Sequence, residues 1–283
     1  MLAPITDPRP PERVRPDRFP VAENLCTVVT NGLVNDRYRH LVLAAPVPAL
    51  DVRAGQFFHL LCPAAGSAQP FLRRPMSVYR VDRANGCIEF LYKVIGAGTQ
   101  AMAALRPGDS FNALGPLGVG FTLDPAWRNI VVIGRGVGLA TLAPLAELAA
   151  ENGVGVTAIL SAASPEYLMS VDLFAQAGGE VITVTDSDGS SAPDNVEAIV
   201  ERLIAARRAD AFFTCGSNRL MLLLKRIAAA RGIPGQVALE QQMACGLGMC
   251  FCCVRAFEVD SEVVARRVCN EGPVFDLREA LSW

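Results

Sequence analysis

The feature that most constrains the fold of this chain is a crowd of cysteines near its C-terminus. Three of them, Cys245, Cys250 and Cys253, follow the spacing Cys-x4-Cys-x2-Cys, and Cys269 comes after fifteen further residues. This is the ligand spacing of plant-type [2Fe–2S] clusters, in which four thiolates converge on two irons. The loop that carries the first three ligands must therefore wrap tightly around a metal centre.

Two glycines inside this run, Gly246 and Gly248, allow the backbone to pass close to inorganic sulfide and to direct amide donors at it. Structural zinc is the main alternative, although zinc sites usually use Cys-x2–4-Cys pairs that close a tetrahedron. Cys252 is surplus to the spacing and is expected to point away from the ligands. The segment is too short for a large hydrophobic core, so a bound cluster should help to hold it.

The composition excludes several classes of protein. Of 283 residues, 51% are hydrophobic and 19% charged, and the mean hydropathy is +0.30, which is the opposite of a disordered chain. A net charge of −2 gives no indication of nucleic-acid binding. The high apolar content has two explanations of about equal weight. Part of the apolar surface is buried against a partner subunit, or the protein is simply an Ala- and Val-rich globular chain. Crowded cysteines without a signal peptide or a membrane span predict a cytoplasmic metalloprotein.

Apolar runs and turn residues divide the chain into four segments. Residues 1–20 hold six prolines and form an irregular arm. Residues 21–123 predict an antiparallel β-barrel, because short β-branched or aromatic runs alternate there with turns. Residues 124–235 alternate strands with helices and predict an α/β domain with a parallel sheet. Residues 236–283 form the small cluster domain, which ends in a helix expected over 277–281.

The expected elements are short in the barrel part and longer in the α/β part. Barrel strands are expected over 25–30, 40–43, 56–62, 76–81 and 87–94. Strands of the parallel sheet are expected over 129–134, 155–162, 180–186, 210–216 and 236–240, and helices over 139–151, 195–207 and 219–230.

Two motifs of the barrel part are suited to a pyrophosphate. The first is Arg-Arg-Pro-Met-Ser at 73–77, where a guanidinium can fork onto phosphate oxygens and the hydroxyl adds a donor. The second is Gly-Ala-Gly-Thr at 96–99, a turn opening a helix expected over 100–105, which offers backbone amides to an anion. Each motif alone is weak, since an exposed arginine or a plain turn would look the same.

A further motif, Gly-Arg-Gly-Val-Gly at 134–138, follows a strand and opens a helix, where the pyrophosphate of a dinucleotide would lie. Cys215 and Gly216 end the fourth strand of this part, at the carboxyl edge where ligands bind in open α/β sheets. A tight turn and a buried thiol are the plain alternatives. His40 and His59 lie on barrel strands and are interpreted as structural, and the acidic stretch 186–189 as a turn.

The order of these motifs, with Leu-Gly-Pro-Leu-Gly at 114–118 and Val-Cys-Asn-Glu-Gly-Pro-Val-Phe at 268–275, is similar to that of one family. The chain resembles the electron-transfer subunits of class 1B dihydroorotate dehydrogenase, within the ferredoxin–NADP reductase superfamily. The resemblance implies an FAD-binding β-barrel, an NAD-binding α/β domain and a C-terminal [2Fe–2S] domain.

The resemblance also implies roles for individual residues. It places Arg74, Pro75, Met76 and Ser77 along FAD, and Gly98 and Thr99 at the FAD pyrophosphate. It directs Gly136 and Gly138 toward NAD(H), with Cys215 as the catalytic residue near the nicotinamide. It makes Cys245, Cys250, Cys253 and Cys269 the ligands of the cluster.

This sequence departs from the family at three places, and one of them is Cys252, which replaces the usual small residue between ligands. Arg135 stands where the family usually has a third glycine, and Thr141 where it often has proline, so nicotinamide binding is expected to be altered. The second strand of the α/β part ends in Ser161-Ala162-Ala163, without the arginine expected for a 2′-phosphate, which favours NADH over NADPH.

The predicted function is that of an electron-transfer subunit, which carries electrons between NAD(H), FAD and a [2Fe–2S] cluster to or from a catalytic flavin-containing partner subunit. That partner is dihydroorotate dehydrogenase or a paralogous oxidoreductase. Two alternatives remain open: a free-standing NADH-dependent reductase that feeds an oxygenase, and a redox sensor without nicotinamide chemistry.

Overall fold

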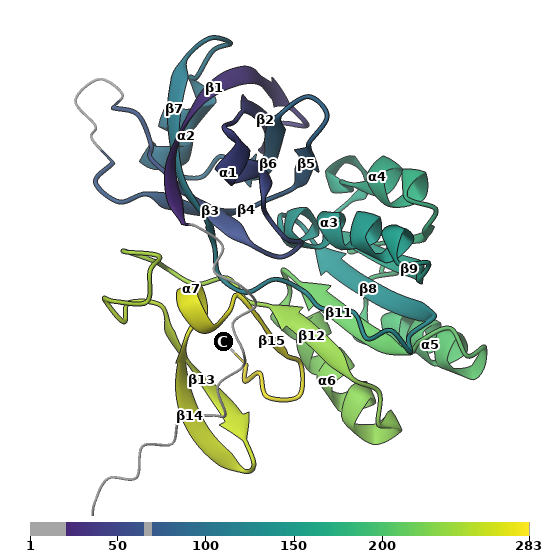
Figure 1. Ribbon diagram of the computed structural model, residues 1–283. Helices are drawn as coiled ribbons and strands as arrows, with labels where there is room; N and C mark the ends of the chain where they lie inside the picture. Colours follow the sequence, from purple (N-terminus) through teal and green to yellow (C-terminus); the bar gives the residue numbers. More distant parts are fainter. Residues whose placement is uncertain (1–20, 65–69, 283) are drawn as a thin grey trace, which may run out of the picture.

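The structure is a computed structural model, and it describes residues 21–64 and 70–282 (Figure 1). The arm expected over 1–20 lies outside the described residues. Two sheets lie one above the other in the view, and a C-terminal hairpin extends beside them. None of the described helices is long and apolar enough to cross a membrane.

The first sheet is antiparallel and curls into a half-barrel of seven strands. In the order β4-β3-β7-β1-β2-β6-β5, they are β4 (Arg74–Ser77), β3 (Phe57–Leu60), β7 (Ser110–Leu117), β1 (Ala22–Leu33), β2 (Tyr38–Ala44), β6 (Cys87–Lys93) and β5 (Arg80–Asp82). Alternation along β1 buries Cys26 and Val28 and leaves Leu25 exposed, as period-two pleating requires. Phe58 and Phe90 meet edge to face at 5.9 Å in the core of this half-barrel.

Two expectations for this sheet need correction. The single strand expected over 76–81 is two strands, because β4 pairs with β3 and β5 pairs with β6, at opposite ends of the strand order. β7 is a further strand, which is not among the predicted ones. Its sequence contains Gly and Pro, yet it pairs between β1 and β3. Two short helices complete the half-barrel, α1 (Val47–Leu50) and α2 (Ala97–Ala103), and α2 begins three residues before the expected helix.

The second sheet is parallel except at one edge. Its order is β10 (Glu180–Thr185), β9 (Gly155–Ala162), β8 (Asn129–Arg135), β11 (Ala211–Cys215), β12 (Gly235–Ala238) and the antiparallel β15 (Val274–Asp276). Helices α3 (Gly138–Glu151) and α4 (Val171–Gln176) pack in one hydrophobic cluster, and α5 (Pro193–Ala205) and α6 (Asn218–Arg231) in another. The strand order reverses between β8 and β11, and their carboxyl ends mark the crevice where such sheets bind ligands.

The C-terminal segment leaves this sheet and returns to it. It forms the hairpin β13 (Val254–Val259) and β14 (Glu262–Arg267), then α7 (Val268–Glu271), and then β15. The prediction of a helix over 277–281 is wrong. The Arg278 amide donates to the Asp276 carboxylate at 2.8 Å in a turn, and Ala280 forms an isolated β-bridge with Phe257. Leu277 and Ala280 are fully buried, so their spacing reflects packing rather than a helix face.

Substitution of one buried and one exposed phenylalanine tests the packing of the half-barrel core. We expect Phe58→Ala, which leaves a void opposite Phe90, to lower the free energy of unfolding by about 3–5 kcal/mol. Phe71→Ala is the matched control, since Phe71 is 94% exposed and its loss should change stability by less than about 0.5 kcal/mol. Urea unfolding followed by circular dichroism measures both. Equal effects of the two substitutions would contradict this packing.

Candidate functional site

A cavity of 850 Å³ opens between the half-barrel and the second sheet. Its charged lining residues are three cations, Arg73, Arg74 and Lys93, and one carboxylate, Glu240. Residues 239–243 form another part of the wall, immediately before the cysteine-rich loop. An excess of positive charge in an enclosed site favours an anionic ligand.

One wall of the cavity is β4, on which Arg74, Pro75, Met76 and Ser77 are all half-buried. The Arg74 guanidinium lies against Gly98, where a Cβ atom would come within 2.8 Å of Arg74 Nε. A side chain at position 98 would therefore displace the arginine from this wall.

Thr99 lines the same cavity from the first turn of α2. Its hydroxyl accepts from the amides of Ile95 at 3.0 Å and Gly96 at 3.2 Å, and so fixes the turn before the helix. The amides of Gly98 and Thr99 belong to the first helical turn, which has no earlier helical carbonyl to bond. This geometry can cradle a pyrophosphate.

A single hydroxyl joins three of the motifs. Thr141 on α3 donates to Ser77 Oγ on β4 at 2.8 Å, and it lies close enough to the Cys215 thiol at the end of β11 to oppose the rise of its pKa. The three residues come from the half-barrel, the dinucleotide motif and the fourth parallel strand. Thr141, a position where the family often has proline, thus connects α3 to β4 and lies beside the end of β11.

The turn between β8 and α3 contains Gly136 and Gly138. Gly136 has φ +56°, which favours glycine. A Cβ atom on Gly138 would lie 2.6 Å from backbone atoms of Cys215 and Gly216, so the helix start can approach β11 only without a side chain. The two segments predicted to bind a nucleotide, the glycine turn after β8 and the end of β11 at Cys215, therefore meet in the crevice between these strands.

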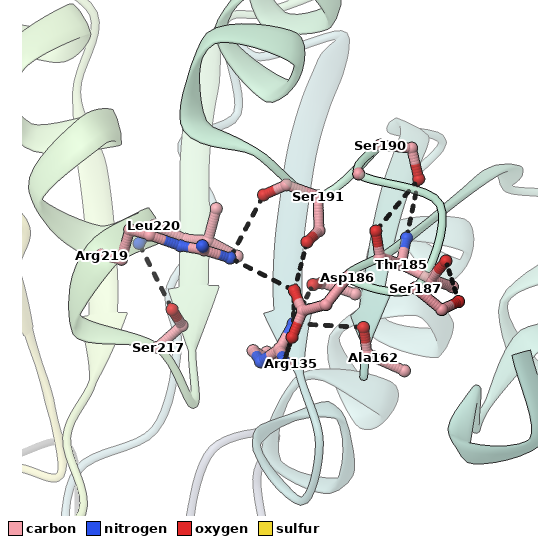
Figure 2. Close-up of polar contacts among 12 residues, drawn as sticks. Arg135, Ala162, Thr185, Asp186, Ser187, Ser190, Ser191, Ser217, Arg219 and Leu220 are labelled. Carbon is pink, nitrogen blue, oxygen red and sulfur yellow. Dashed lines mark hydrogen bonds and ion pairs between the residues drawn. The ribbon is translucent and has the colours of Figure 1, made fainter. Parts of the chain in front are cut away.

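Arg135 does not extend freely from this turn. It lies across the end of β9, where it donates to Ser161 Oγ at 2.8 Å, and it forms an ion pair with Asp186 at 2.5 Å (Figure 2). Asp186 also accepts from the Ser191 hydroxyl and faces Arg219 at 3.6 Å. The Ser191 hydroxyl and the Arg135 guanidinium hold the pKa of Asp186 below its usual range. Both guanidinium groups are therefore occupied by protein acceptors at the edge of the sheet.

The four spacing cysteines come together as two pairs. The Cys250 thiol lies close enough to Cys245 to lower its pKa, and Cys253 lies next to Cys269, whose backbone amide donates to Cys253 Sγ at 3.4 Å. Among the described residues, no three His, Cys, Asp or Glu side chains converge as ligands of a single metal ion. Two adjacent pairs suit a centre of two irons, each held by two thiolates.

Backbone amides point at these sulfurs. Leu247 N lies 3.3 Å from Cys245 Sγ, and Gly248 N lies 3.2 Å from Cys269 Sγ. Burial would raise the pKa of Cys245, but amide donors and Cys250 overcome this and lower it to about 6. Cys252 is exposed, and its sulfur lies 3.9 Å from the carbonyl of Gln242. The loop is therefore arranged to stabilise negative sulfur.

Sequence reasoning missed two residues of this region. Glu240 lines the cavity close enough to Cys215 to raise its pKa, and desolvation raises the pKa of Glu240 itself. His59 was interpreted as structural, but it is fully buried against the cysteine-rich loop, and neither ring nitrogen has a hydrogen-bond partner among the described residues. No sequence signal reveals either residue, because both contacts depend on how the C-terminal segment packs.

Comparison with known proteins agrees with this geometry. Residues 240–280 match the profile of the iron–sulfur cluster binding domain of dihydroorotate dehydrogenase B. The electron transfer subunit of dihydroorotate dehydrogenase B (NAD(+)) from Geobacillus thermodenitrificans is 34% identical over 90% of this chain and 97% of its own. The chain belongs to the family of these electron transfer subunits. A member from Enterococcus faecalis is 32% identical over 92% of this chain and 98% of its own.

Solved structures place the family fold among ferredoxin reductases. The NADH-dependent reduced ferredoxin-NADP oxidoreductase matches with a TM-score of 0.76 and 26% identity, over 90% of this chain and 89% of that chain. The ferredoxin reductase of carbazole 1,9a-dioxygenase, at 19% identity and a TM-score of 0.61 over 76% of this chain and 66% of that one, shares the fold. The chain is therefore an oxidoreductase component with a ferredoxin reductase-like half-barrel and parallel sheet.

The burial of Cys215 predicts its reactivity. Burial raises the pKa of this thiol far above its ordinary value, so it should stay protonated up to about pH 9. We expect iodoacetamide to label Cys215 much more slowly than the exposed Cys252, and denaturation to remove the difference. Peptide mass spectrometry at increasing pH measures both sites in one sample. Rapid labelling of Cys215 in the folded chain would contradict the structure.

Proposed function

We propose that this chain is the electron-transfer subunit of a flavoenzyme complex. It would carry electrons between NAD(H), FAD and a [2Fe–2S] cluster, to or from a catalytic subunit. The observation that carries this proposal is continuity: residues 239–243 line the cationic cavity, and the paired cysteines begin at Cys245. A cofactor in the cavity and a cluster on the cysteines would thus both contact the same short stretch of the chain.

The cavity suits FAD. Arg74, Pro75, Met76 and Ser77 would line the flavin, and the amides of Gly98 and Thr99 would hold its pyrophosphate. The excess of cations on the wall and the close approach of the Arg74 guanidinium to Gly98 both support an anionic dinucleotide. FAD supplies a centre that exchanges an electron pair with nicotinamide and single electrons with iron–sulfur clusters. The protein orients it, and the apolar part of the wall excludes water.

The crevice between β8 and β11 would hold the nicotinamide nucleotide. Gly136 and Gly138 would face its pyrophosphate, and Cys215 would lie near the nicotinamide. NADH is favoured over NADPH, because β9 ends at Ser161 and Ala162 without an arginine that could bind a 2′-phosphate. Arg135 and Arg219 are both held by Asp186, which leaves neither free to read a phosphate. The relatives named above carry NAD(+) in their names.

The four spacing cysteines, Cys245, Cys250, Cys253 and Cys269, would ligate the cluster as two pairs. Their paired thiols and the amides directed at sulfur fit a [2Fe–2S] centre.

A catalytic subunit would cover the outside of this loop. Met249 and Phe251 are 78% and 62% exposed, and Leu247 is 41% exposed. Large apolar side chains on a cluster loop are suited to burial against a partner. By analogy with the named relatives, the partner is the catalytic subunit of dihydroorotate dehydrogenase or a paralogue, in the cytoplasm.

Anaerobic reduction tests the electron path. We expect NADH to bleach the flavin of the purified protein and then to produce the electron paramagnetic resonance (EPR) signal of a reduced [2Fe–2S] cluster. NADPH should reduce the flavin at least tenfold more slowly than NADH, which corresponds to a free-energy difference of at least about 1.4 kcal/mol. Co-purification under the same conditions should recover a flavin-bearing catalytic subunit at a fixed ratio. A bleach by NADPH as fast as by NADH would overturn the nucleotide preference.

The cysteine assignment has a control at the neighbouring residue. We expect Cys253→Ser to remove the EPR signal and most of the bound iron, because one iron loses a thiolate. Cys252→Ser should retain both, since Cys252 is exposed and outside the pairs. Iron and acid-labile sulfide analysis measures the occupancy. Loss of the cluster in both variants would contradict the proposed ligand set.

A further inference from the structure

His59 is the one histidine of this chain whose ring contacts the cysteine-rich loop. It lies on β3 and is 0% exposed, and neither Nδ1 nor Nε2 has a hydrogen-bond partner among the described residues. Burial, helped by the nearby Arg73 cation, lowers the pKa of His59 to about 4, so the ring is neutral near pH 7. A neutral imidazole still carries one N–H, and a buried N–H without an acceptor is unfavourable.

The imidazole packs with its face against the loop. A Cβ atom on Gly246 would lie 2.9 Å from His59 Cε1 and 3.0 Å from each ring nitrogen. Gly246 has φ +70° and directly follows Cys245, so the loop turns at the place where the imidazole meets it. The glycine is needed here for the space that the ring occupies as well as for the turn.

Strand geometry directs His59 to the cysteine side of the sheet rather than to the half-barrel core. Phe57 and His59 leave β3 on one face, while Phe58 and Leu60 enter the core on the other. Phe57 packs in the same hydrophobic cluster as Cys253 and Cys269, and its ring lies 5.8 Å from that of His59. Phe57 also lines the cavity proposed for FAD, whereas His59 does not.

We propose that His59 donates its ring N–H to a sulfur atom of the [2Fe–2S] cluster held by the four cysteines. The inference rests on the proposed function, because the acceptor is the cluster itself. Sulfur gains negative charge when the cluster takes up an electron, so a donor stabilises the reduced form and raises the midpoint potential. β3 would thereby link the half-barrel directly to the redox properties of the C-terminal segment.

The chain contains only two histidines, which makes the test specific. His40 lies on β2 in the half-barrel and pairs with Glu89 at 2.7 Å. In the His40→Gln variant labelled with ¹⁵N-histidine, His59 is the only labelled residue. We expect the reduced cluster to show a ¹⁵N hyperfine coupling in pulsed EPR of this full-length holoprotein, and the His40→Gln/His59→Leu double variant to lose it.

Potentiometric titration supplies the second readout. We expect a lower midpoint potential in His59→Leu, a smaller decrease in His59→Gln because its amide keeps an N–H donor, and no change in His40→Gln. A [2Fe–2S] signal without ¹⁵N coupling would overturn the inference even if His59→Leu fails to fold, and so would an unchanged potential in a fully loaded His59→Leu variant. Absence of any [2Fe–2S] signal from the wild-type chain would instead overturn the proposed function.

Discussion

The return of the C-terminal segment to the second sheet is the constraint on which the rest of the structure depends. β15 pairs with β12, the Phe257 and Phe275 rings lie 4.3 Å apart, and Val119 donates to the Gly272 carbonyl. These contacts close the segment that carries all four spacing cysteines into a loop whose two ends are fixed. The cysteine pairs can then form at a defined place against β3, without a large core of their own.

The same packing places the candidate sites next to one another. Residues 239–243 belong to the cavity wall and lead directly into the loop, while Phe57 lines the cavity and packs in the hydrophobic cluster that contains Cys253 and Cys269. Thr141 ties β4 to the end of β11 through Ser77 and Cys215. An electron carrier needs its redox centres close together and rigidly held. Here β4, β11 and α3 meet at the Thr141 hydroxyl.

Much of the fold was predictable because buried strands and amphipathic helices leave clear periodic patterns. The strands expected over 129–134 and 155–162 and the helix expected over 219–230 correspond to β8, β9 and α6. The errors lie where tertiary pairing overrides local pattern. β7 contains Gly and Pro but is paired on both sides, and the apolar spacing at 277–281 serves a turn.

The sequence by itself indicated the chemistry: the cysteine spacing, the glycine turns and the arginine motif, taken in their order along the chain, predict the types of ligand, because such patterns depend on residue type within a few positions. Only the tertiary structure decided which distant residues meet. It tied Arg135 to Asp186, joined Ser77 to Thr141 and set His59 against Gly246. These contacts span tens of residues along the chain, and they arise from the packing of the two sheets and the C-terminal segment, which no local pattern encodes.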